Sequence, residues 1–370
     1  MTLALWADAL ALARQSIGLS SPNPRVGCII ADAQGVVIGR GFTQQRGGPH
    51  AEVVAMEDAR IRGHDLHGAT AYVTLEPCSH HGHTGPCCDA LIAAGIKKVV
   101  ASIADPNPLV AGQGFARLRA AGVEVQVGPG AAESRELNIG FFSRMIRRVP
   151  WVRMKVAASL DGKTALDNGI SQWITAEAAR ADGHTWRARA SAVLTGIGTV
   201  LEDNPRLDVR LVEMPHQPHL VVVDSRLEIP LEAHLFIAER TLYIYAAVRN
   251  DAKKAALEAR GATVIYLPGQ TPQTSAKVDL AAMLRDLARR EVNELHVEAG
   301  FKLNGSLIRE GLVDEFLVYL APKLLGQGRG MANFGPLTEL SQAVPLAFQS
   351  SQMIGPDLRI LARIPGRDQF

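Results

Sequence analysis

Hydrophobic residues in the first third of the chain recur at helix-like and strand-like spacings in turn. Leu3, Trp6 and Ile17 belong to the apolar face of a helix predicted near residues 2–17. Apolar residues 25–31 and 35–42 flank a short polar turn, which predicts a hairpin. Further strands are predicted at residues 70–76, 98–103 and 123–127, and further helices at residues 49–62, 87–94 and 114–121. This alternation predicts a three-layer αβα domain.

Proline and glycine residues mark where these elements begin and end. Pro49 is expected in the first turn of its helix, and Gly95 directly after the end of another. Near residue 146 the pattern breaks, because Pro150 ends a helix and a new apolar strand follows at 151–157. More strands are predicted at residues 192–195, 219–223, 241–246, 263–267, 294–298 and 315–320, with helices between several of them. We therefore predict two α/β domains, residues 1–146 and 147–370.

Composition and charge narrow the class of protein. A chain of 370 residues, 47% of them hydrophobic, is large enough for two ordinary globular cores. The net charge of 39 − 37 = +2 predicts no strong field for nucleic acid or an anionic membrane. The apolar start lacks a basic region and is interrupted by Asp8, and no apolar run reaches the ~18 residues of a membrane span. We expect a cytoplasmic protein that binds neither nucleic acid nor membrane.

Four residues point to zinc chemistry. His50, Cys78 and Cys87 supply one imidazole and two thiolates, which leaves one zinc position open for water. Glu52 would then move protons between the attacking water and the leaving amine. This combination is the signature of zinc-dependent deaminases that act on nucleobase-like rings.

Two cysteines remain outside this set. A closed structural zinc site with Cys88 as the fourth ligand is the alternative, but adjacent residues rarely reach the same ion, so Cys88 is expected to be a packed neighbour. Cys28 lies in an apolar strand and is expected in the core. Four cysteines are too few for a disulfide framework in a chain of this length.

The second half carries three weaker signals for a nucleotide and a phosphorylated ligand. Residues 195–199 (Thr-Gly-Ile-Gly-Thr) follow a strand and open a helix, but the third glycine of a dinucleotide fingerprint is absent. Glu298-Ala299-Gly300 also ends a strand before a helix. Arg187 and Arg210 are candidates for a phosphate clamp, although each taken singly is typical of a solvated surface arginine.

Taken together, the motifs resemble the bifunctional deaminase–reductase family of riboflavin biosynthesis over the whole chain. The residues that carry the resemblance are Asn23-Pro24 with Val26-Gly27, His50-Ala51-Glu52, Pro77-Cys78-Ser79-His80, Thr84-Gly85-Pro86-Cys87 and Asp105-Pro106-Asn107-Pro108 in the first half. In the second half they are Met154-Lys155-Val156-Ala157, Ser159-Leu160-Asp161-Gly162, Ser171-Gln172-Trp173-Ile174-Thr175 and Glu202-Asp203-Asn204-Pro205. The resemblance implies a cytidine-deaminase-like first domain and a dihydrofolate-reductase-like second domain.

The resemblance also implies substrates and site residues. The first half would deaminate 2,5-diamino-6-(5-phosphoribosylamino)pyrimidin-4(3H)-one with one zinc ion per chain. Its ring and ribose pocket would be lined by Asn23, His80, Asp105 and Asn107. At position 83 the family commonly has lysine or arginine for the substrate phosphate, whereas this chain has His83, whose charge depends on pH.

The second half would reduce the ribosyl group of 5-amino-6-(5-phosphoribosylamino)uracil to ribityl with NADPH. By the resemblance, its substrate would be held by Ser171, Arg187, Leu207, Arg210 and Glu298. The NADPH site would be lined by Ala157, Trp173, Thr199, Asp203, Ser225 and Gly300. Lys155 would help in proton transfer or in positioning the sugar, and Ser225-Arg226 would suit the 2′-phosphate of NADPH.

Two other functions remain as alternatives at this stage. An RNA adenosine or cytidine deaminase with an accessory nucleotide-binding domain would share His50, Glu52, Cys78 and Cys87. A nucleotide-binding protein with a structural zinc would not need Glu52. A homodimer or homotetramer is expected from the resemblance alone.

Overall fold

The computed structural model describes residues 2–80, 85–108 and 110–370, and for Thr2 and Leu3 the backbone only. His83, a predicted substrate-binding residue, lies outside the described residues. The chain divides into two compact units, Met1–Arg148 and Val149–Phe370. None of the helices in the described part of the chain is long and apolar enough to cross a membrane.

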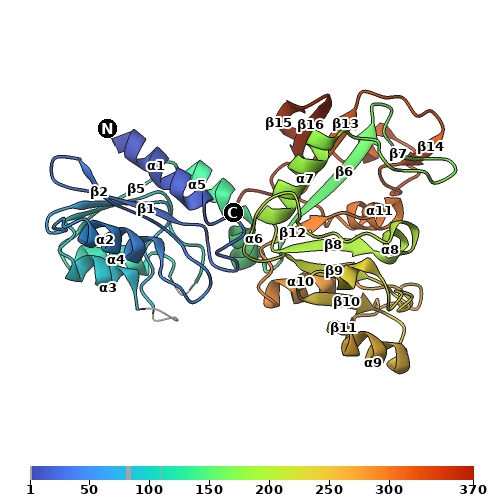
Figure 1. The fold of residues 1–370 in the computed structure, drawn as a ribbon, viewed down its shortest axis with the longest axis horizontal. Helices are drawn as coiled ribbons and strands as arrows, with labels where there is room; N and C mark the ends of the chain where they lie inside the picture. Colours follow the sequence, from blue (N-terminus) through green and yellow to red (C-terminus); the bar gives the residue numbers. More distant parts are fainter. Residues whose placement is uncertain (1, 81–84, 109) are drawn as a thin grey trace. The chain divides into compact units, whose positions relative to one another are not determined.

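In the first unit, a mixed sheet lies between two layers of helices (Figure 1). The strands in sheet order are β2 (Val37–Phe42), β1 (Gly27–Ala31), β3 (Thr70–Val73), β4 (Lys98–Ala101) and β5 (Glu124–Val127). β1 pairs antiparallel with β2 and β3, whereas β3, β4 and β5 are parallel. The helices are α1 (Thr2–Arg14), α2 (Ala51–Ile61), α3 (Cys87–Ala93), α4 (Gln113–Ala120), α5 (Ala131–Leu137) and α6 (Ile139–Arg147). α1 and α5 lie on one side of the sheet, and α2, α3 and α4 on the other.

Helix α2 packs closely on β2 because glycines of the strand face it. A Cβ atom at Gly41 would lie 2.3 Å from the carbonyl oxygen of Ala51, and one at Gly39 would lie 2.2 Å from that of Ala55. Only glycine permits this approach of two backbones. It holds the first turn of α2, directly after His50, against the sheet.

Two boundaries differ from the sequence predictions in this unit. The prediction that Pro49 lies in the first turn of α2 is wrong, because the helix begins at Ala51 with His50 as its N-cap. The carbonyl oxygen of Pro49 instead accepts a hydrogen bond from the backbone N–H of Gln44. The strand predicted to run to residue 76 ends as β3 at Val73. Helix α5 was not predicted.

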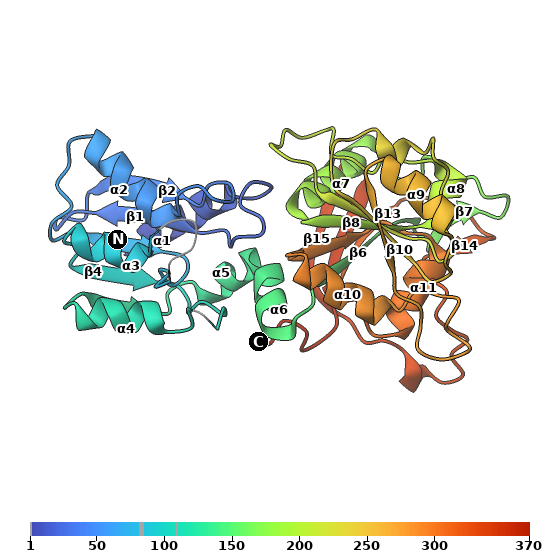
Figure 2. The same ribbon diagram turned by 90° about the horizontal axis from the view of Figure 1, so that it is seen from below.

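The second unit is built on a nine-stranded sheet (Figure 2). In sheet order its strands are β11 (Ala262–Tyr266), β10 (Leu242–Ala246), β9 (His219–Val223), β8 (Ala192–Gly196), β12 (Glu294–Val297), β6 (Trp151–Ser159), β13 (Glu315–Ala321), β16 (Asp357–Arg363) and β15 (Ala347–Ile354). The strands from β11 to β13 are parallel to one another, and β16 and β15 extend the sheet by antiparallel pairing. A small separate sheet joins β7 (Lys163–Leu166) to β14 (Gly328–Gly330).

Helices cover both faces of this larger sheet. They are α7 (Glu177–Arg189), α8 (Ile197–Asp203), α9 (Asp251–Ala259), α10 (Leu280–Arg289) and α11 (Phe301–Arg309). One core joins apolar residues of α10 and α11 to alternate residues of the central strands, such as Val152 and Met154. A second core gathers α8, α9 and the strands from β8 to β11.

The C-terminal hairpin of β15 and β16 and the pair β7–β14 were not predicted. Nearly every residue of β15 is exposed, so the strand carries no alternation of apolar and polar residues that could mark it. It forms because its backbone pairs with β16 from Ala347 to Ile354.

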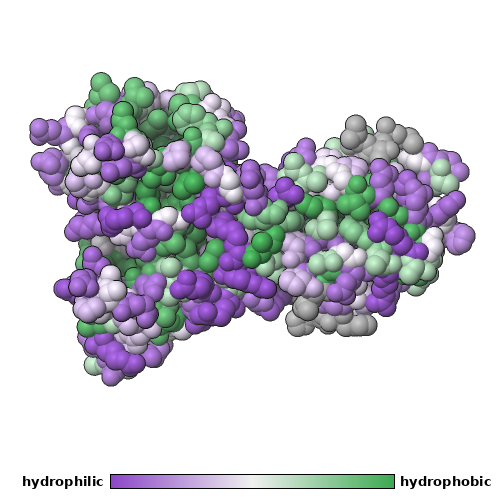
Figure 3. All heavy atoms as spheres, turned by 180° about the vertical axis from the view of Figure 1, so that it is seen from behind, coloured by the Kyte–Doolittle hydropathy of each residue, from purple (hydrophilic) through white to green (hydrophobic). Residues whose placement is uncertain are grey.

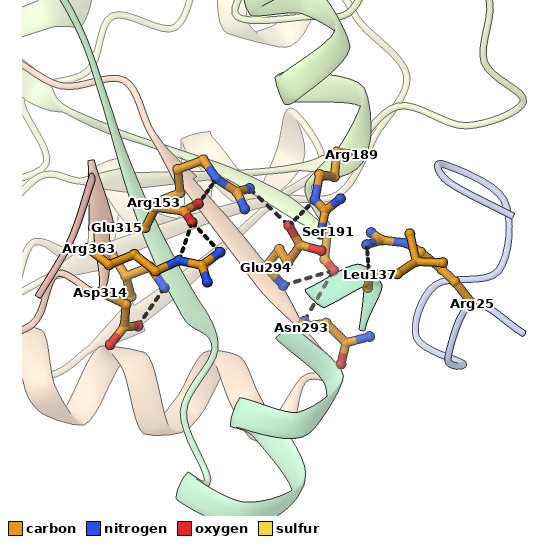
Figure 4. A network of polar contacts seen from close by, with 11 residues as sticks. Arg25, Leu137, Arg153, Arg189, Ser191, Asn293, Glu294, Asp314, Glu315 and Arg363 are labelled. Atoms are coloured by element: carbon orange, nitrogen blue, oxygen red, sulfur yellow. Dashed lines mark hydrogen bonds and ion pairs between the residues drawn. The ribbon is translucent and has the colours of Figure 1, made fainter. Parts of the chain in front are cut away.

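The face of the central strands opposite the α10–α11 core carries buried charges. Arg153 of β6 pairs with Glu294 of β12 at 2.9 Å and with Glu315 of β13. Arg189 and Arg363 extend the chain of ion pairs at its two ends, as Figure 4 shows. The Arg153 side chain is 1% exposed, and α7 covers it with Trp186, whose ring centre lies 4.6 Å from the guanidinium carbon. Each buried charge thus has an opposite charge in contact, which burial of ions requires.

Candidate active sites

His50 and Glu52 are placed by the start of α2. His50 is the N-cap of the helix, with extended backbone angles of −76° and 165°, and Glu52 lies in the first turn with 4% of its surface exposed. The turn in backbone direction at the N-cap lets two residues that are two positions apart serve one site.

The two cysteines come from different elements and meet at His50. Cys78 lies in the loop after β3, and Cys87 is the first residue of α3. The Nδ1 atom of His50 is 3.5 Å from the Sγ of Cys78 and 3.3 Å from the Sγ of Cys87. The three ligand atoms all lie within 4.8 Å of one another. One nitrogen and two sulfurs at this spacing fit a single zinc ion with one position open.

Cys88 does not join this cluster. Its thiol donates to the carbonyl oxygen of Pro77 at 3.2 Å and lies 3.5 Å from that of Gly114. Cys28 is fully buried in β1. Both expectations from the sequence are therefore confirmed: Cys88 is a packed neighbour, and Cys28 is a core residue.

The electrostatics of the cluster suit proton transfer by Glu52. Burial, reinforced by the negative charge of Cys78, raises the pKa of Glu52 to about 7. Hydrogen bonding with the Cys87 thiol and with His50 lowers the pKa of Cys78 to about 4. The backbone N–H of Cys87 also donates to the Cys78 sulfur at 3.3 Å, which favours the thiolate. A carboxyl group whose pKa is near neutrality can both accept and return a proton.

The predicted pocket residues of the first unit lie on three loops. Asn23 is half-buried in the loop before β1, and its N–H donates to the Ser20 carbonyl oxygen at 2.8 Å. His80 lies in the loop that follows Cys78, and its Nδ1 is buried with no hydrogen-bond partner among the described residues. Asp105 follows β4, and its Oδ1 accepts the N–H of Asn107 at 2.7 Å. Burial raises the pKa of Asp105 to about 7.

In the second unit, Glu298 at the end of β12 is the centre of a charged cluster. Arg187 of α7 donates two hydrogen bonds to its carboxylate, at 2.6 and 3.0 Å, and the Nζ of Lys155 lies 3.7 Å away. Burial alone would raise the pKa of Glu298, but the charges of Arg187 and Lys155 hold it well below its usual range. Arg187 is only 11% exposed, so its interpretation as a solvated surface arginine is wrong.

Arg187 and Arg210 both bind Asp208, but they bind different atoms of it. Arg187 donates to the backbone oxygen of Asp208 at 2.5 Å, and Arg210 binds the Asp208 carboxylate at 2.8 Å. Leu207, beside them, has a positive φ of 51° and is 7% exposed. The N–H of Arg210 donates to Nδ1 of His184 at 3.2 Å, which requires that nitrogen to be unprotonated.

Two predicted cofactor residues lie side by side. Gly300 is the N-cap of α11, and a Cβ atom there would lie 3.4 Å from the Oγ1 of Thr199 in α8. The other four are placed singly by their own elements. Ala157 is half-buried in β6, and Asp203 is exposed at the end of α8. The Ser225 hydroxyl accepts the N–H of Val278 at 3.3 Å. Trp173 is 63% exposed under the guanidinium of Arg180.

Comparison with known proteins decides the family. The model of the RibD C-terminal domain matches residues 150–360, and the model of the cytidine and deoxycytidylate deaminase zinc-binding region matches residues 3–103. The chain belongs to the RibD family.

Relatives of the RibD family cover this chain almost from end to end. It is 41% identical to riboflavin biosynthesis protein RibD of Escherichia coli, over 95% of this chain and 96% of the relative. It is 38% identical to RibD of Aquifex aeolicus over 95% of each chain. The solved structure of Acinetobacter baumannii RibD, 37% identical, superposes with a TM-score of 0.87 over 98% of both chains. That of a Thermotoga maritima diaminohydroxyphosphoribosylaminopyrimidine deaminase/5-amino-6-(5-phosphoribosylamino)uracil reductase, 32% identical, gives 0.85 over 98% of both.

Membership of the RibD family confirms the main sequence predictions. The chain is a bifunctional deaminase and reductase of riboflavin biosynthesis, with a zinc-binding deaminase domain and a reductase domain that acts on small molecules. The predicted fold class, cytidine-deaminase-like followed by dihydrofolate-reductase-like, is confirmed as well. The RNA-deaminase alternative is not favoured, because the second half matches the RibD C-terminal domain.

Two polar residues of these sites did not stand out from the sequence. Glu76 is buried beside Pro77-Cys78 and accepts four backbone hydrogen bonds. Its only signal was a carboxylate directly before the Pro-Cys pair. His184 is 4% exposed and contacts the Arg210 loop. Only its place three residues before Arg187, on one helix face, could have indicated it.

Proposed function

We propose that residues 1–146 deaminate 2,5-diamino-6-(5-phosphoribosylamino)pyrimidin-4(3H)-one and that residues 147–370 reduce the resulting 5-amino-6-(5-phosphoribosylamino)uracil with NADPH. The observation that carries the proposal is the convergence of His50, Cys78 and Cys87 beside the buried Glu52, in a chain whose other unit has the reductase fold. The Thermotoga maritima relative bears the names of both activities.

In the deaminase unit, His50, Cys78 and Cys87 would hold one zinc ion per chain. Bound zinc supplies a Lewis acid that makes water a nucleophile near neutral pH. Glu52 accepts a proton from the attacking water and gives it to the amino group, which leaves as ammonia from the ring carbon where the new C–O bond forms. Glu52 is buried in the first turn of α2 beside these ligands, where a carboxyl group can serve in both steps.

Four other residues of the deaminase unit would bind the rest of the substrate. Asn23, His80, Asp105 and Asn107 are assigned to the ring and ribose. The buried Nδ1 of His80 has no hydrogen-bond partner among the described residues, which supports this role because a ligand atom would satisfy it. His83 is assigned to the phosphate, with a charge that grows as pH falls through the histidine range.

In the reductase unit, the substrate would lie against the cluster around Glu298. NADPH, when bound, would supply a hydride to C1′ of the sugar in its open-chain imine form, and the imine nitrogen would take up a proton. Arg187 fixes the Glu298 carboxylate, and Glu298 can accept hydrogen bonds from ribose hydroxyls because its charge is retained. Lys155, 3.7 Å from Glu298, can deliver the proton that completes the reduction. Ser171, Leu207 and Arg210 complete the assigned substrate site.

The cofactor would be held by residues from several elements of the second unit. Thr199 and Gly300 meet between α8 and α11, where a missing side chain at Gly300 leaves room for a phosphate or ribose. Ala157, Trp173, Asp203 and Ser225 are assigned to the same site. The exposed Arg226 beside Ser225 suits the 2′-phosphate of NADPH.

We further propose that the protein works in the cytoplasm as a homodimer or homotetramer and binds no nucleic acid. Two thiol ligands favour a reducing compartment, and the net charge of +2 offers little attraction to polyphosphate.

Figure 3 shows hydrophobic residues at several places on the surface, and Phe348 on the open edge strand β15 is 76% exposed. Light scattering of wild type and Phe348→Glu tests this: we expect an oligomer that the variant weakens, and a monomeric wild type would contradict it.

A two-stage assay tests the enzymatic proposal. Purified, zinc-loaded protein receives the phosphoribosylated diaminopyrimidinone, and ammonia is measured before NADPH is added and NADPH oxidation afterwards. Ammonia followed by oxidation is expected. Ammonia without oxidation would overturn the second assignment, and absence of ammonia would overturn the first.

A further inference from the structure

Glu76 is a buried carboxylate that the proposed reaction does not use. It lies in the loop after β3, and only 3% of its surface is exposed. Its two oxygens accept hydrogen bonds from four backbone N–H groups: Oε2 from Asp105 at 3.1 Å and Gly112 at 2.9 Å, and Oε1 from Gly114 at 2.9 Å and Phe115 at 3.2 Å.

Four acceptor bonds are the full capacity of a carboxylate. They compensate for burial of the charge, and two of them cap the start of α4, where a negative charge is favourable. A glutamine of the same shape offers one oxygen and one NH₂ group, so it can accept only part of this set. The arrangement therefore favours glutamate over glutamine at position 76.

The four bonds tie down both ends of one loop. At one end is Asp105, whose carboxylate accepts the N–H of Asn107. At the other is the first turn of α4, beginning at Gly112. Asp105 and Asn107 are two of the residues assigned to the ring and ribose of the substrate, so Glu76 holds the stretch of chain that presents them.

The same junction includes the zinc-binding loop. Glu76 stands two positions before Cys78, and the intervening Pro77 is packed so closely on α4 that a Cβ atom at Gly114 would lie 2.1 Å from its carbonyl oxygen. That oxygen also accepts the thiol of Cys88, the neighbour of the second cysteine ligand. A shift of the Asp105 loop would therefore change its position relative to the metal ligands Cys78 and Cys87.

We propose that Glu76 is a positioning residue of the deaminase site, which sets Asp105 and Asn107 relative to Cys78 and so determines the affinity for the pyrimidine substrate. The proposal rests on the function proposed above. Glu76 acts through the loop that begins at Asp105, because its carboxylate already accepts four backbone N–H groups and has no acceptor capacity left for substrate.

The first test is steady-state deamination by the full-length, zinc-loaded Glu76→Gln variant. We expect zinc content and kcat close to wild type and a KM raised about tenfold or more, because binding geometry is lost and the reacting groups are kept. Glu57→Gln, at an exposed carboxylate of α2, is the matched control and should leave both constants unchanged. A wild-type KM in Glu76→Gln would overturn the proposal.

A double-mutant cycle separates positioning from general bracing. If Glu76 acts through Asp105, Glu76→Gln should raise KM much less in an Asp105→Asn background than alone. If the two substitutions raise KM independently, so that their effects multiply, the proposal is overturned. A Glu76→Gln variant with lower zinc content and unchanged KM would also overturn it, because a merely structural role predicts that result. If Glu76→Gln does not fold, Glu76→Asp keeps the charge on a shorter side chain, and a wild-type KM there would overturn it equally. Wild type that releases no ammonia would instead overturn the proposed function.

Discussion

The two sites solve the burial of charge in opposite ways. In the first unit, His50, Cys78 and Cys87 bring three donor atoms within 4.8 Å of one another, and two of these atoms are sulfurs that metal binding makes anionic. In the second unit, the carboxylate of Glu298 is already met by Arg187 and Lys155 from its own protein. The cluster of the first unit needs a metal cation from solution to balance its charge, whereas in the second unit Arg187 and Lys155 provide the positive charge.

The surroundings of the sites follow the same difference. The deaminase cluster is braced by backbone groups, such as the N–H of Cys87 on the Cys78 sulfur. The reductase unit instead uses ion pairs between side chains, both around Glu298 and in the separate set of Arg153, Glu294 and Glu315. We therefore expect the deaminase to respond to metal and the reductase to respond to the loss of a single charge.

Removal of a zinc ligand should separate the two activities most sharply. Cys87→Ser is expected to lose zinc and all detectable ammonia release, because a thiolate ligand is replaced by a weakly acidic hydroxyl. NADPH oxidation with preformed 5-amino-6-(5-phosphoribosylamino)uracil should continue. Metal analysis and the two assays measure this.

Cys88→Ser is the matched control for that experiment. Serine keeps a donor for the Pro77 carbonyl oxygen, so zinc and deaminase activity should be retained. Equal loss of zinc from both variants would contradict the assignment of Cys87, rather than Cys88, as the ligand.

The next largest effect is expected at Glu52. Glu52→Gln keeps the shape of the side chain but can neither accept nor return a proton, so kcat for ammonia release should fall about 10²–10⁴-fold while zinc stays bound. Reductase activity should not change. A variant with near-normal kcat would show that another group transfers the proton.

These predictions also show what the sequence could and could not reveal. His50, Glu52, Cys78 and Cys87 could be proposed from the sequence because the chemistry assigned to them resides in their own side chains and follows a spacing. Glu76 and His184 could not, because their importance lies in contacts with backbone groups 26 to 39 positions away.

The same distinction holds for the fold. β9 was predicted at residues 219–223, because a buried parallel strand is an uninterrupted apolar run. β15 escaped prediction because an exposed edge strand is stabilised by backbone pairing alone and needs no apolar pattern. Pro49 misled because a proline can precede an N-cap as well as follow one.

Loss of one charge in the second unit should cost stability as well as activity. Arg187→Met leaves the Glu298 carboxylate, 12% exposed, with Lys155 as the nearby lysine or arginine partner that the described residues supply, so we expect a loss of about 3 kcal/mol in the free energy of unfolding and loss of NADPH oxidation. The loss in the free energy of unfolding is measured by urea unfolding, with tryptophan fluorescence as the signal.

A second substitution sharpens the interpretation. Arg187→Met combined with Glu298→Leu removes both charges and should regain much of the stability without regaining activity. Arg289→Met, at a side chain that is 70% exposed, should change stability by less than about 0.5 kcal/mol. An Arg187→Met protein as stable as this control would contradict the idea that the cluster depends on its internal cation.

The smallest expected effect is a pH dependence of the second unit through His184. Burial, with the charges of Arg187 and Arg210, lowers the pKa of His184 to about 4, below the ~6.5 of an unfolded histidine. The unfolded chain therefore binds the proton more readily, and the stabilising contribution is fully present above pH ~6.5 and declines as pH falls toward 4. Between pH 7.5 and 5 the loss in the free energy of unfolding should be at most about 2 kcal/mol, and less where solvent screens the charges. His184→Asn keeps an acceptor for the Arg210 N–H but does not titrate. The free energy of unfolding of this variant, measured in urea by tryptophan fluorescence, should therefore fall less over this pH range than that of wild type. Identical pH profiles would show that His184 is not neutral in the folded unit, against the hydrogen bond that its Nδ1 accepts.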